Sequence, residues 1–244
     1  MGRWRGYGGR VGTYAAVVLA GGAARRMGGV DKPALPVGGR PMRDRVLVAV
    51  SDATPRVLVG AADSVPAGVR VVREDPPGGG PVAAAAAGLA LLDPDVSLVA
   101  LLAADLPLLT PAAIGDLLKH LDRETPDTEQ PGGGSAPAPP ARSGSAPAPP
   151  AHSGPAGERG PDGACFVDGD GRRQSLCGVW RVTALRAALD RLTVERGGSL
   201  SGAPVRALLA GLVVREVAWS GEGPPPWFDC DTDEDVRRAE EWTR

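Results

Sequence analysis

The sequence predicts a single α/β domain with three layers, in which a mainly parallel β-sheet lies between two layers of helices. Two observations predict this fold. Short apolar runs rich in Val, Leu and Ala alternate along the chain with longer, helix-like segments, which implies parallel strands covered by helices. The first run, residues 14–20, is apolar throughout rather than at every second position, which is typical of a strand buried on both faces.

The first half of the chain supplies four predicted strands and three predicted helices. The strands are residues 14–20, 56–60, 69–72 and 97–103, and the helices are residues 43–51, 81–92 and 111–121. Pro81 and Pro111 stand in the first turns of their helices, where the missing N–H has no helical partner to lose. Thr110 is the predicted N-cap of the third helix.

The second half continues the pattern after an interruption. Strands are predicted at residues 164–168, 176–181 and 212–219, and helices at 183–192, in the later part of 199–209, and at 232–242. Thr183 is a candidate N-cap for the first of these helices. Acids at positions 233–235 fall in the first turn of the last helix, where the helix dipole favours them.

The interruption is a Pro/Ala/Gly-rich tract, residues 125–162. It holds ten of the chain's 25 prolines and a tandem repeat, GSAPAPPARS at 134–143 and GSAPAPPAHS at 144–153. Such a composition cannot bury apolar surface, so we predict a disordered insert. Four parts follow: a disordered Gly/Arg-rich arm (1–13), a first part of the domain (14–124), the insert (125–162), and a second part of the same domain (163–244).

Composition limits the function. A net charge of −2 and a pI near 5.8 give no basic face for a nucleic-acid partner. The three cysteines are far apart and form no CxxC pair, which argues against a disulfide framework or zinc site and for a reducing cytoplasm. A secretory leader is the alternative, but its apolar run would have only seven residues. No run approaches the ~18 apolar residues that would cross a membrane.

The strongest chemical signal is LAGGAARRMGGVDK, residues 19–32. It begins where the first buried strand ends, at the carboxyl edge of the sheet where ligands bind in open α/β folds. Its glycines let backbone N–H groups approach phosphates, and Arg25, Arg26 and Lys32 supply cations for a polyphosphate. It matches neither the P-loop nor the GxGxxG pattern, and a flexible basic loop is the alternative.

This string resembles LAGGxSxRMGxDK, the signature of the molybdenum cofactor guanylyltransferase family, with Ala24 in place of Ser and with two residues instead of one between Gly28 and Asp31. The resemblance implies a Rossmann-like fold and a nucleotide bound by residues 19–22. Those four are Leu19, Ala20, Gly21 and Gly22. It further implies that Arg26 contacts phosphates and that Lys32 neutralises the triphosphate. Arg26, Lys32 and Asp105 are the predicted catalytic residues.

Asp105 stands directly after the apolar strand 97–103, in the string AADLP. An acid at that edge is usually kept for a cation or a hydrogen-bond network, although it could also cap a helix. The string resembles the family's CDxP element, whose Asp binds Mg²⁺ and contacts the nucleotide. Mg²⁺ needs only one or two protein carboxylates, because water and phosphate oxygens complete its shell.

Two further elements resemble parts of the family pattern. Glu74 and Asp75 precede a Gly-rich turn, and the resemblance assigns Asp75 to the nucleotide; a solvated acid in a turn is the alternative. Residues 229–235 resemble NxNTPEDL, with Asp229 and Asp231 replacing both asparagines. Asp229 is the second predicted metal ligand. Alternatively, Thr232 only caps the last helix and the acids favour its dipole.

The function that the sequence predicts is Mg²⁺-dependent transfer of a nucleoside monophosphate to a phosphorylated acceptor, with release of pyrophosphate. GMP transfer from GTP to molybdopterin is the first expectation. Transfer of CMP or another nucleotide to a different acceptor, or a non-catalytic nucleotide-binding relative, are the alternatives. Residues 172–177 occupy the place where the family approaches its pterin acceptor.

Overall fold

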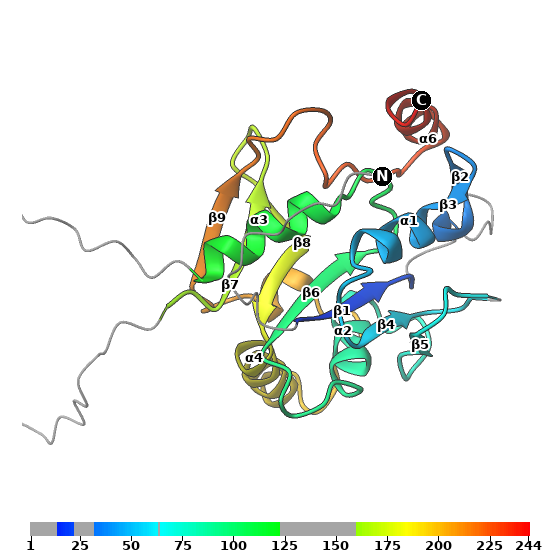
Figure 1. Cartoon of the computed structure of the whole chain (residues 1–244). Helices are drawn as coiled ribbons and strands as arrows, with labels where there is room; N and C mark the ends of the chain where they lie inside the picture. The colour runs from blue at the N-terminus through cyan, green and yellow to red at the C-terminus, as the bar shows by residue number, and fades with distance from the viewer. Residues whose placement is uncertain (1–13, 22–31, 63, 123–159) are drawn as a thin grey trace, which may run out of the picture.

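The computed structural model describes residues 14–21, 32–62, 64–122 and 160–244 (Figure 1). Its centre is a seven-stranded sheet in the order β5-β4-β1-β6-β8-β7-β9. The strands are β1 (Tyr14–Leu19), β4 (Arg56–Val59), β5 (Val69–Val72), β6 (Leu98–Ala103), β7 (Gly163–Val167), β8 (Arg173–Arg181) and β9 (Val214–Ala218). The predicted mainly parallel sheet is confirmed.

One strand runs against the others. β1 pairs in parallel with β4 and β6, β4 with β5, and β7 with β9, whereas β8 is antiparallel to both β6 and β7. The last pair in the β6–β8 register is Leu102 with Cys177, so the amino-terminal part of β8 extends beyond the end of β6. The start of β8 and the carboxyl ends of β1 and β6 therefore share one edge of the sheet.

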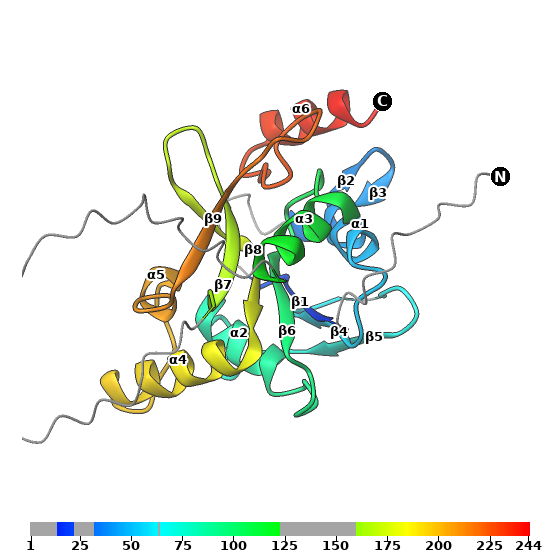
Figure 2. The ribbon, with the colours of Figure 1, turned by 60° about the vertical axis from the view of Figure 1, so that its left-hand side comes forward.

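Helices cover both faces, which confirms the three layers (Figure 2). On one face lie α1 (Met42–Ala49) and α3 (Pro111–Asp122), and on the other α2 (Pro81–Leu89), α4 (Val182–Glu195) and α5 (Val205–Leu208). β1 contributes to the apolar cores on both faces of the sheet. Ala16 and Val18 face the core under α1 and α3, and Ala15 and Val17 face the core under α2, α4 and α5. A strand so placed has to be apolar at every position, as residues 14–20 are.

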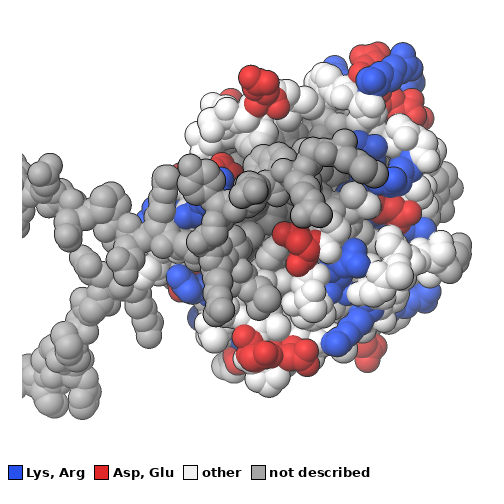
Figure 3. Space-filling model, viewed as in Figure 1, with Lys and Arg blue, Asp and Glu red and all other residues white. Residues whose placement is uncertain are grey.

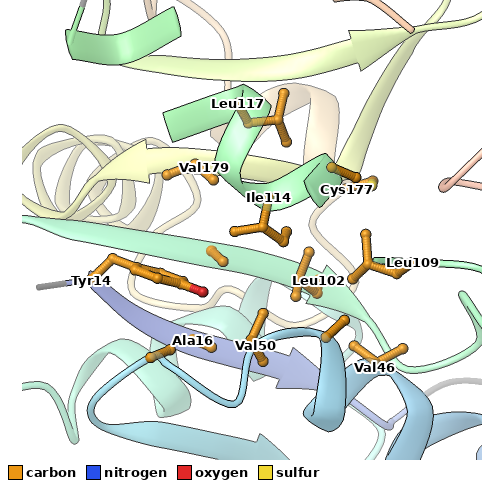
Figure 4. Packing of buried hydrophobic residues seen from close by; sticks show 14 of the residues in the cluster. Tyr14, Ala16, Val46, Val50, Leu102, Leu109, Ile114, Leu117, Cys177 and Val179 are labelled. Carbon is orange, nitrogen blue, oxygen red and sulfur yellow. The ribbon is translucent and has the colours of Figure 1, made fainter. Parts of the chain in front are cut away.

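Figure 4 shows the core between the sheet and the α1–α3 layer. Val46 and Val50 come from the α1 region and Ile114 and Leu117 from α3, and all four meet the strands. Each is at most 1% exposed. Burial of such side chains is worth about 1.5–3 kcal/mol each relative to exposure, so this layer holds the helices firmly on the sheet.

Most predicted elements agree with the structure to within a few residues at each end, and β5 agrees in both bounds. Thr110 is confirmed as a cap, because its hydroxyl accepts a hydrogen bond from Ala113 N–H at 3.2 Å. The predicted Thr183 cap is wrong. The α4 helix begins at Val182 with Arg181 as N-cap and no side-chain cap, which places Thr183 within the first turn.

A short hairpin, β2 (Pro36–Val37) and β3 (Arg40–Pro41), was not predicted. Gly38 and Gly39 form its turn with φ values of 57° and 75°. Positive φ at both central residues is what a tight two-residue hairpin turn requires, and glycine adopts it without strain. The Gly-Gly pair is a sequence signal for such a hairpin, and a single helical turn, η2 (Lys32–Ala34), precedes it.

The last helix, α6 (Asp233–Trp242), lies over the hairpin (Figures 1 and 2). Thr232 is its N-cap, and a reciprocal capping box joins Thr232 and Asp235. A third apolar cluster holds the helix in place through Val37, Met42, Leu108, Cys230 and Ala239. The cap reading of Thr232 is thus confirmed, and it fixes where residues 229–231 enter the helix.

The described chain resumes at Gly160, and Asp162 already belongs to the sheet region. Asp162 N–H donates to Val213 O at 2.7 Å, and Asp162 O accepts from Arg181 N–H at 2.8 Å. The second part of the domain therefore starts slightly before residue 163. Residues 1–13 and 123–159, which include the whole predicted arm and most of the predicted insert, lie outside the described residues.

On the face shown in Figure 3, the described Lys and Arg side chains lie among Asp and Glu side chains rather than in one continuous basic patch. Within the described part of the chain, no helix is long and apolar enough to cross a membrane. All three cysteines, Cys165, Cys177 and Cys230, are free and buried. Burial raises the pKa of the Cys165 thiol to about 11 and that of Cys230 to about 12, so neither is an activated nucleophile at neutral pH.

Candidate active site

A pocket of about 610 Å³ lies at the edge where β1 and β6 end and β8 begins. Its volume is in the usual range for small-ligand sites. The pocket wall comes from six places along the chain: Leu19, Ala20 and Gly21; Lys32 and Pro33; Pro81; Ala103, Ala104, Asp105 and Leu106; Gln174, Leu176 and Cys177; Trp227, Asp229, Asp231 and Thr232. Most of the predicted site residues that the structure describes therefore meet in one cavity.

The β1 side of the pocket is shaped by close backbone contacts. Ala20 N–H donates to Val59 O at 2.7 Å, which holds the first residue after β1 against the neighbouring strand. Gly60, with φ of 140°, makes room for this contact, because a Cβ at that position would lie 2.9 Å from the Ala20 carbonyl carbon. Leu19, Ala20 and Gly21 are thus fixed at the pocket wall, while Gly22 and Arg26 lie outside the described residues.

Lys32 forms ion pairs with two carboxylates of the pocket wall. Its Nζ donates to Asp105 Oδ2 and to Asp231 Oδ1, each at 2.7 Å. The Lys32 side chain is 18% exposed, Asp105 24% and Asp231 64%. Burial by itself would lower the pKa of Lys32, but the hydrogen bonds to the two carboxylates raise it above its ordinary value. The ammonium is therefore charged at every physiological pH.

Backbone hydrogen bonds join the Asp105 region to the end of β1 and to the residues just before α6. Ala104 N–H donates to Leu19 O at 3.0 Å, and Cys230 N–H donates to Asp105 O at 3.3 Å. These bonds tie the β6 end to the β1 end on one side and to residues 229–231 on the other. The backbone of Asp105 is therefore fixed, and its side chain lines the pocket, where it accepts the hydrogen bond from Lys32.

Asp229 brings a third carboxylate. Its pKa is raised, first because the surrounding protein removes water from it, and then because Asp231 and Asp105 carry like charge nearby. In the described part of the pocket, three carboxylates face one lysine, so a cation with hard oxygen preference suits the site. The three carboxylates are not grouped closely enough to hold one ion together, since no such group of three or more His, Cys, Asp or Glu occurs among the described residues, but Mg²⁺ needs only one or two.

The two acids before the Gly-rich turn have different places. Asp75 is exposed and is not part of the pocket wall. Glu74 is only 8% exposed, and its Oε1 accepts a hydrogen bond from Gly78 N–H at 3.0 Å. A Cβ on Gly21 would lie 3.3 Å from that same oxygen. Glu74 therefore lies close to the Gly21 backbone, a position that sequence reasoning missed because adjacent acids carry no signal for which one is buried.

Trp227 is the other residue that sequence reasoning missed. It lines the pocket together with Gln174, Leu176 and Cys177 of β8. The β8 residues come from the stretch that the family resemblance placed near the acceptor, and they form the side of the pocket opposite β1 across β6. A lone Trp in a Pro-rich linker gives no periodic signal, so only the fold could place it.

The family model of the MobA-like NTP transferase domain matches residues 16–212. The chain belongs to the MobA-like NTP transferase family. That match spans most of the sequence and includes both the residue 19–32 string and Asp105. A search of curated proteins finds no significant match.

Solved structures share the fold of this chain. The 2-C-methyl-D-erythritol 4-phosphate cytidylyltransferase of Thermus thermophilus is similar with a TM-score of 0.58 and 16% identity, over 94% of this chain and 98% of that one. The molybdopterin-guanine dinucleotide biosynthesis protein A of Archaeoglobus fulgidus has a TM-score of 0.57 and 18% identity, over 93% and 97%. Both identities are low, so these likenesses establish fold alone.

Proposed function

We propose that this MobA-like transferase moves GMP from GTP to the phosphate of a molybdopterin acceptor, with release of pyrophosphate. The observation that carries the proposal is the order β1–β6–β8 at the pocket edge. Asp105 follows β6, the central strand of these three. Leu19, Ala20 and Gly21 line the pocket on the β1 side, and Gln174 and Trp227 line it on the β8 side. Two substrates could therefore meet at Asp105.

The chemistry needs positioning and charge more than a covalent intermediate. An oxygen of the acceptor phosphate would attack the α-phosphorus in line with the leaving group. The new P–O bond forms as the bond to pyrophosphate breaks. The acceptor phosphate is ionised near neutral pH, so no general base is required. Lys32 offsets charge on the phosphates of the donor, and Arg26 of the same residue 19–32 string is proposed to do likewise.

Asp105 and Asp229 would hold Mg²⁺, because their oxygens are the hard donors it prefers and the surrounding charge is negative. When bound, the ion would neutralise phosphate oxygens. Displacing Lys32 Nζ from Asp105 would free that ammonium for the triphosphate. Asp75 remains proposed as a nucleotide contact, and the three reduced cysteines support a cytoplasmic enzyme.

A cytidylyl or other nucleotidyl transfer is the second candidate, and it is favoured by the structural similarity to the Thermus thermophilus cytidylyltransferase. The test is pyrophosphate release measured with each of the four NTPs and Mg²⁺, with molybdopterin, with 2-C-methyl-D-erythritol 4-phosphate, or with no acceptor. Release that requires GTP and molybdopterin supports the proposal. Release with CTP and the erythritol phosphate supports the alternative.

Asp105→Asn is the matched variant for this assay. It keeps the size of the side chain but removes the anion proposed for Mg²⁺, so turnover should fall by about 100-fold or more while the far-UV spectrum is unchanged. Asp116→Asn on α3 is the control, because that acid lies away from the pocket. A fully active Asp105→Asn enzyme would remove Asp105 from the reaction, and no release under any condition would leave a nucleotide-binding protein without transferase activity.

A further inference from the structure

The indole of Trp227 is supported by a neighbouring aromatic side chain. It packs on Phe166 of β7, with ring centroids 5.3 Å apart and planes inclined by 34°. Phe166 is fully buried, and a second ring, Trp219, meets it edge-on at 5.5 Å. Trp227 is only partly buried and lines the pocket. Because the buried Phe166 ring packs against it, the indole is held in place as part of the pocket wall.

The side-chain amide of Gln174 also has a fixed orientation. Its Nε2 donates to Asp168 Oδ2 at 3.0 Å. A carboxylate can only accept, so the amide nitrogen must face Asp168 and the Gln174 Oε1 must face the other way. Asp168 is itself fixed, since its Oδ1 accepts from the N–H groups of Asp170 at 3.0 Å and Arg172 at 2.8 Å. The pocket wall thus includes an amide whose carbonyl oxygen has a set orientation.

The rest of this wall is apolar. Leu176 and Cys177 complete it on β8, and none of its four described side chains carries a charge at neutral pH. An open-chain polyol phosphate would bring several hydroxyls to a wall that offers one amide. The faces of a planar heteroaromatic ring lose little hydration free energy on leaving water, and they bury apolar area by stacking on an indole. The chemistry of the wall therefore matches a planar heteroaromatic ring with N–H donors on its edge.

We propose that Trp227 and Gln174 determine acceptor specificity by binding the planar heteroaromatic ring of the acceptor, the indole through its face and the Gln174 carbonyl oxygen through a ring N–H. This inference rests on the proposed transfer to a phosphorylated acceptor, and it names the two side chains that select a pterin-like acceptor over a sugar-like one. Neither residue touches the reacting phosphates. Both would act by binding the acceptor ring.

Binding can be tested without turnover. The affinity of the full chain for 6-hydroxymethylpterin is measured by titration calorimetry, with Trp227→Leu, Trp227→Phe and Gln174→Leu as variants. Trp227→Leu should weaken binding by about tenfold or more, Trp227→Phe by less because a ring face remains, and Gln174→Leu by several-fold. Trp242→Leu is the matched control, because that Trp is 44% exposed and absent from this pocket. Wild-type protein that does not bind the pterin overturns the inference.

Steady-state kinetics separate this inference from the proposed function. With molybdopterin as acceptor, Trp227→Leu should raise the acceptor KM about tenfold, leave the GTP KM unchanged and largely preserve kcat, with Trp227→Phe restoring most of the KM. An unchanged acceptor KM overturns the role of Trp227 while the transfer reaction stands. A raised GTP KM would place the guanine on the indole and also overturn it. Pterin binding that depends on Trp227 in a protein without transferase activity would reject the proposed transfer and keep only the pterin-binding site.

Discussion

Lys32 Nζ lies 2.7 Å from Asp231 Oδ1, across 199 residues of sequence. The same nitrogen is bound to Asp105, so the one lysine of the pocket wall is engaged by two carboxylates. In the related family signature the position of Asp231 is an asparagine. A triphosphate that binds Lys32 must therefore compete with the Asp231 carboxylate.

Asp231→Asn should strengthen nucleotide binding. The amide keeps the shape but removes a negative charge that competes with phosphate for Lys32. Because Asp231 is 64% exposed, the effect is modest, and we expect up to about a fivefold lower Kd for a non-hydrolysable GTP analogue. Calorimetry with Asp233→Asn as control measures it, since Asp233 is an exposed acid outside the pocket. Weaker binding would instead make Asp231 a ligand for the metal–nucleotide complex.

Lys32→Arg should be damaging although the charge is kept. Arginine is longer, planar and forked, and cannot place one compact charge between Asp105 and Asp231. Loss of a charge-assisted contact in the transition state is worth about 2–4 kcal/mol, or roughly 30- to 1,000-fold in kcat. Lys119→Arg on α3 is the control, because it is the other lysine and is exposed. Full activity of Lys32→Arg would show that Lys32 only stabilises the pocket, and lost affinity with intact turnover would make it a ground-state anchor.

Tyr14→Phe tests a bond at the start of β1. The Tyr14 hydroxyl donates to Asp52 Oδ1 at 2.6 Å, and the variant should lose about 1 kcal/mol of unfolding free energy at pH 7, as Asp52 is exposed. Burial, then the hydrogen bond and charge of Asp52, raise the folded-state pKa of Tyr14. A raised pKa means that this contribution is complete below about pH 10 and is lost as the pH rises above it.

Urea unfolding between pH 7 and pH 11 measures this effect. The wild-type protein should lose stability above pH 10 more steeply than Tyr14→Phe, which has no group to ionise there. Asp52→Asn keeps an acceptor oxygen and should show a smaller loss at pH 7. Equal slopes for wild type and Tyr14→Phe would contradict the assignment.

Replacing residues 125–157 with a short Gly/Ser linker should leave activity and melting temperature nearly unchanged. The reason is the composition of the tract, which offers nothing to pack. The replacement keeps Asp162, whose backbone pairs with Val213 and Arg181. A second variant that also removes residues 158–162 should be clearly less stable. A large loss of melting temperature in the first variant would give the tract a structural role.

Local patterns in the sequence were enough for the three-layer fold and most elements. A strand buried on both faces must be apolar throughout, as residues 14–20 are, and Thr110 and Thr232 cap their helices because short-range geometry decides a cap. The residue 19–32 string and Asp105 could be located because they directly follow buried strands, at the edge that binds ligands.

Long-range packing decided the rest. Lys32, Asp105 and Asp231 are separated by 73 and 199 residues, and nothing local specifies that one ammonium binds both acids. The antiparallel course of β8 brings Gln174 to the pocket, and the packing of Phe166 under Trp227 brings an indole there. Sequence periodicity reports which face of an element is apolar. Which elements become neighbours, and whether Glu74 or Asp75 is buried, depends on the free energy of the whole packed chain.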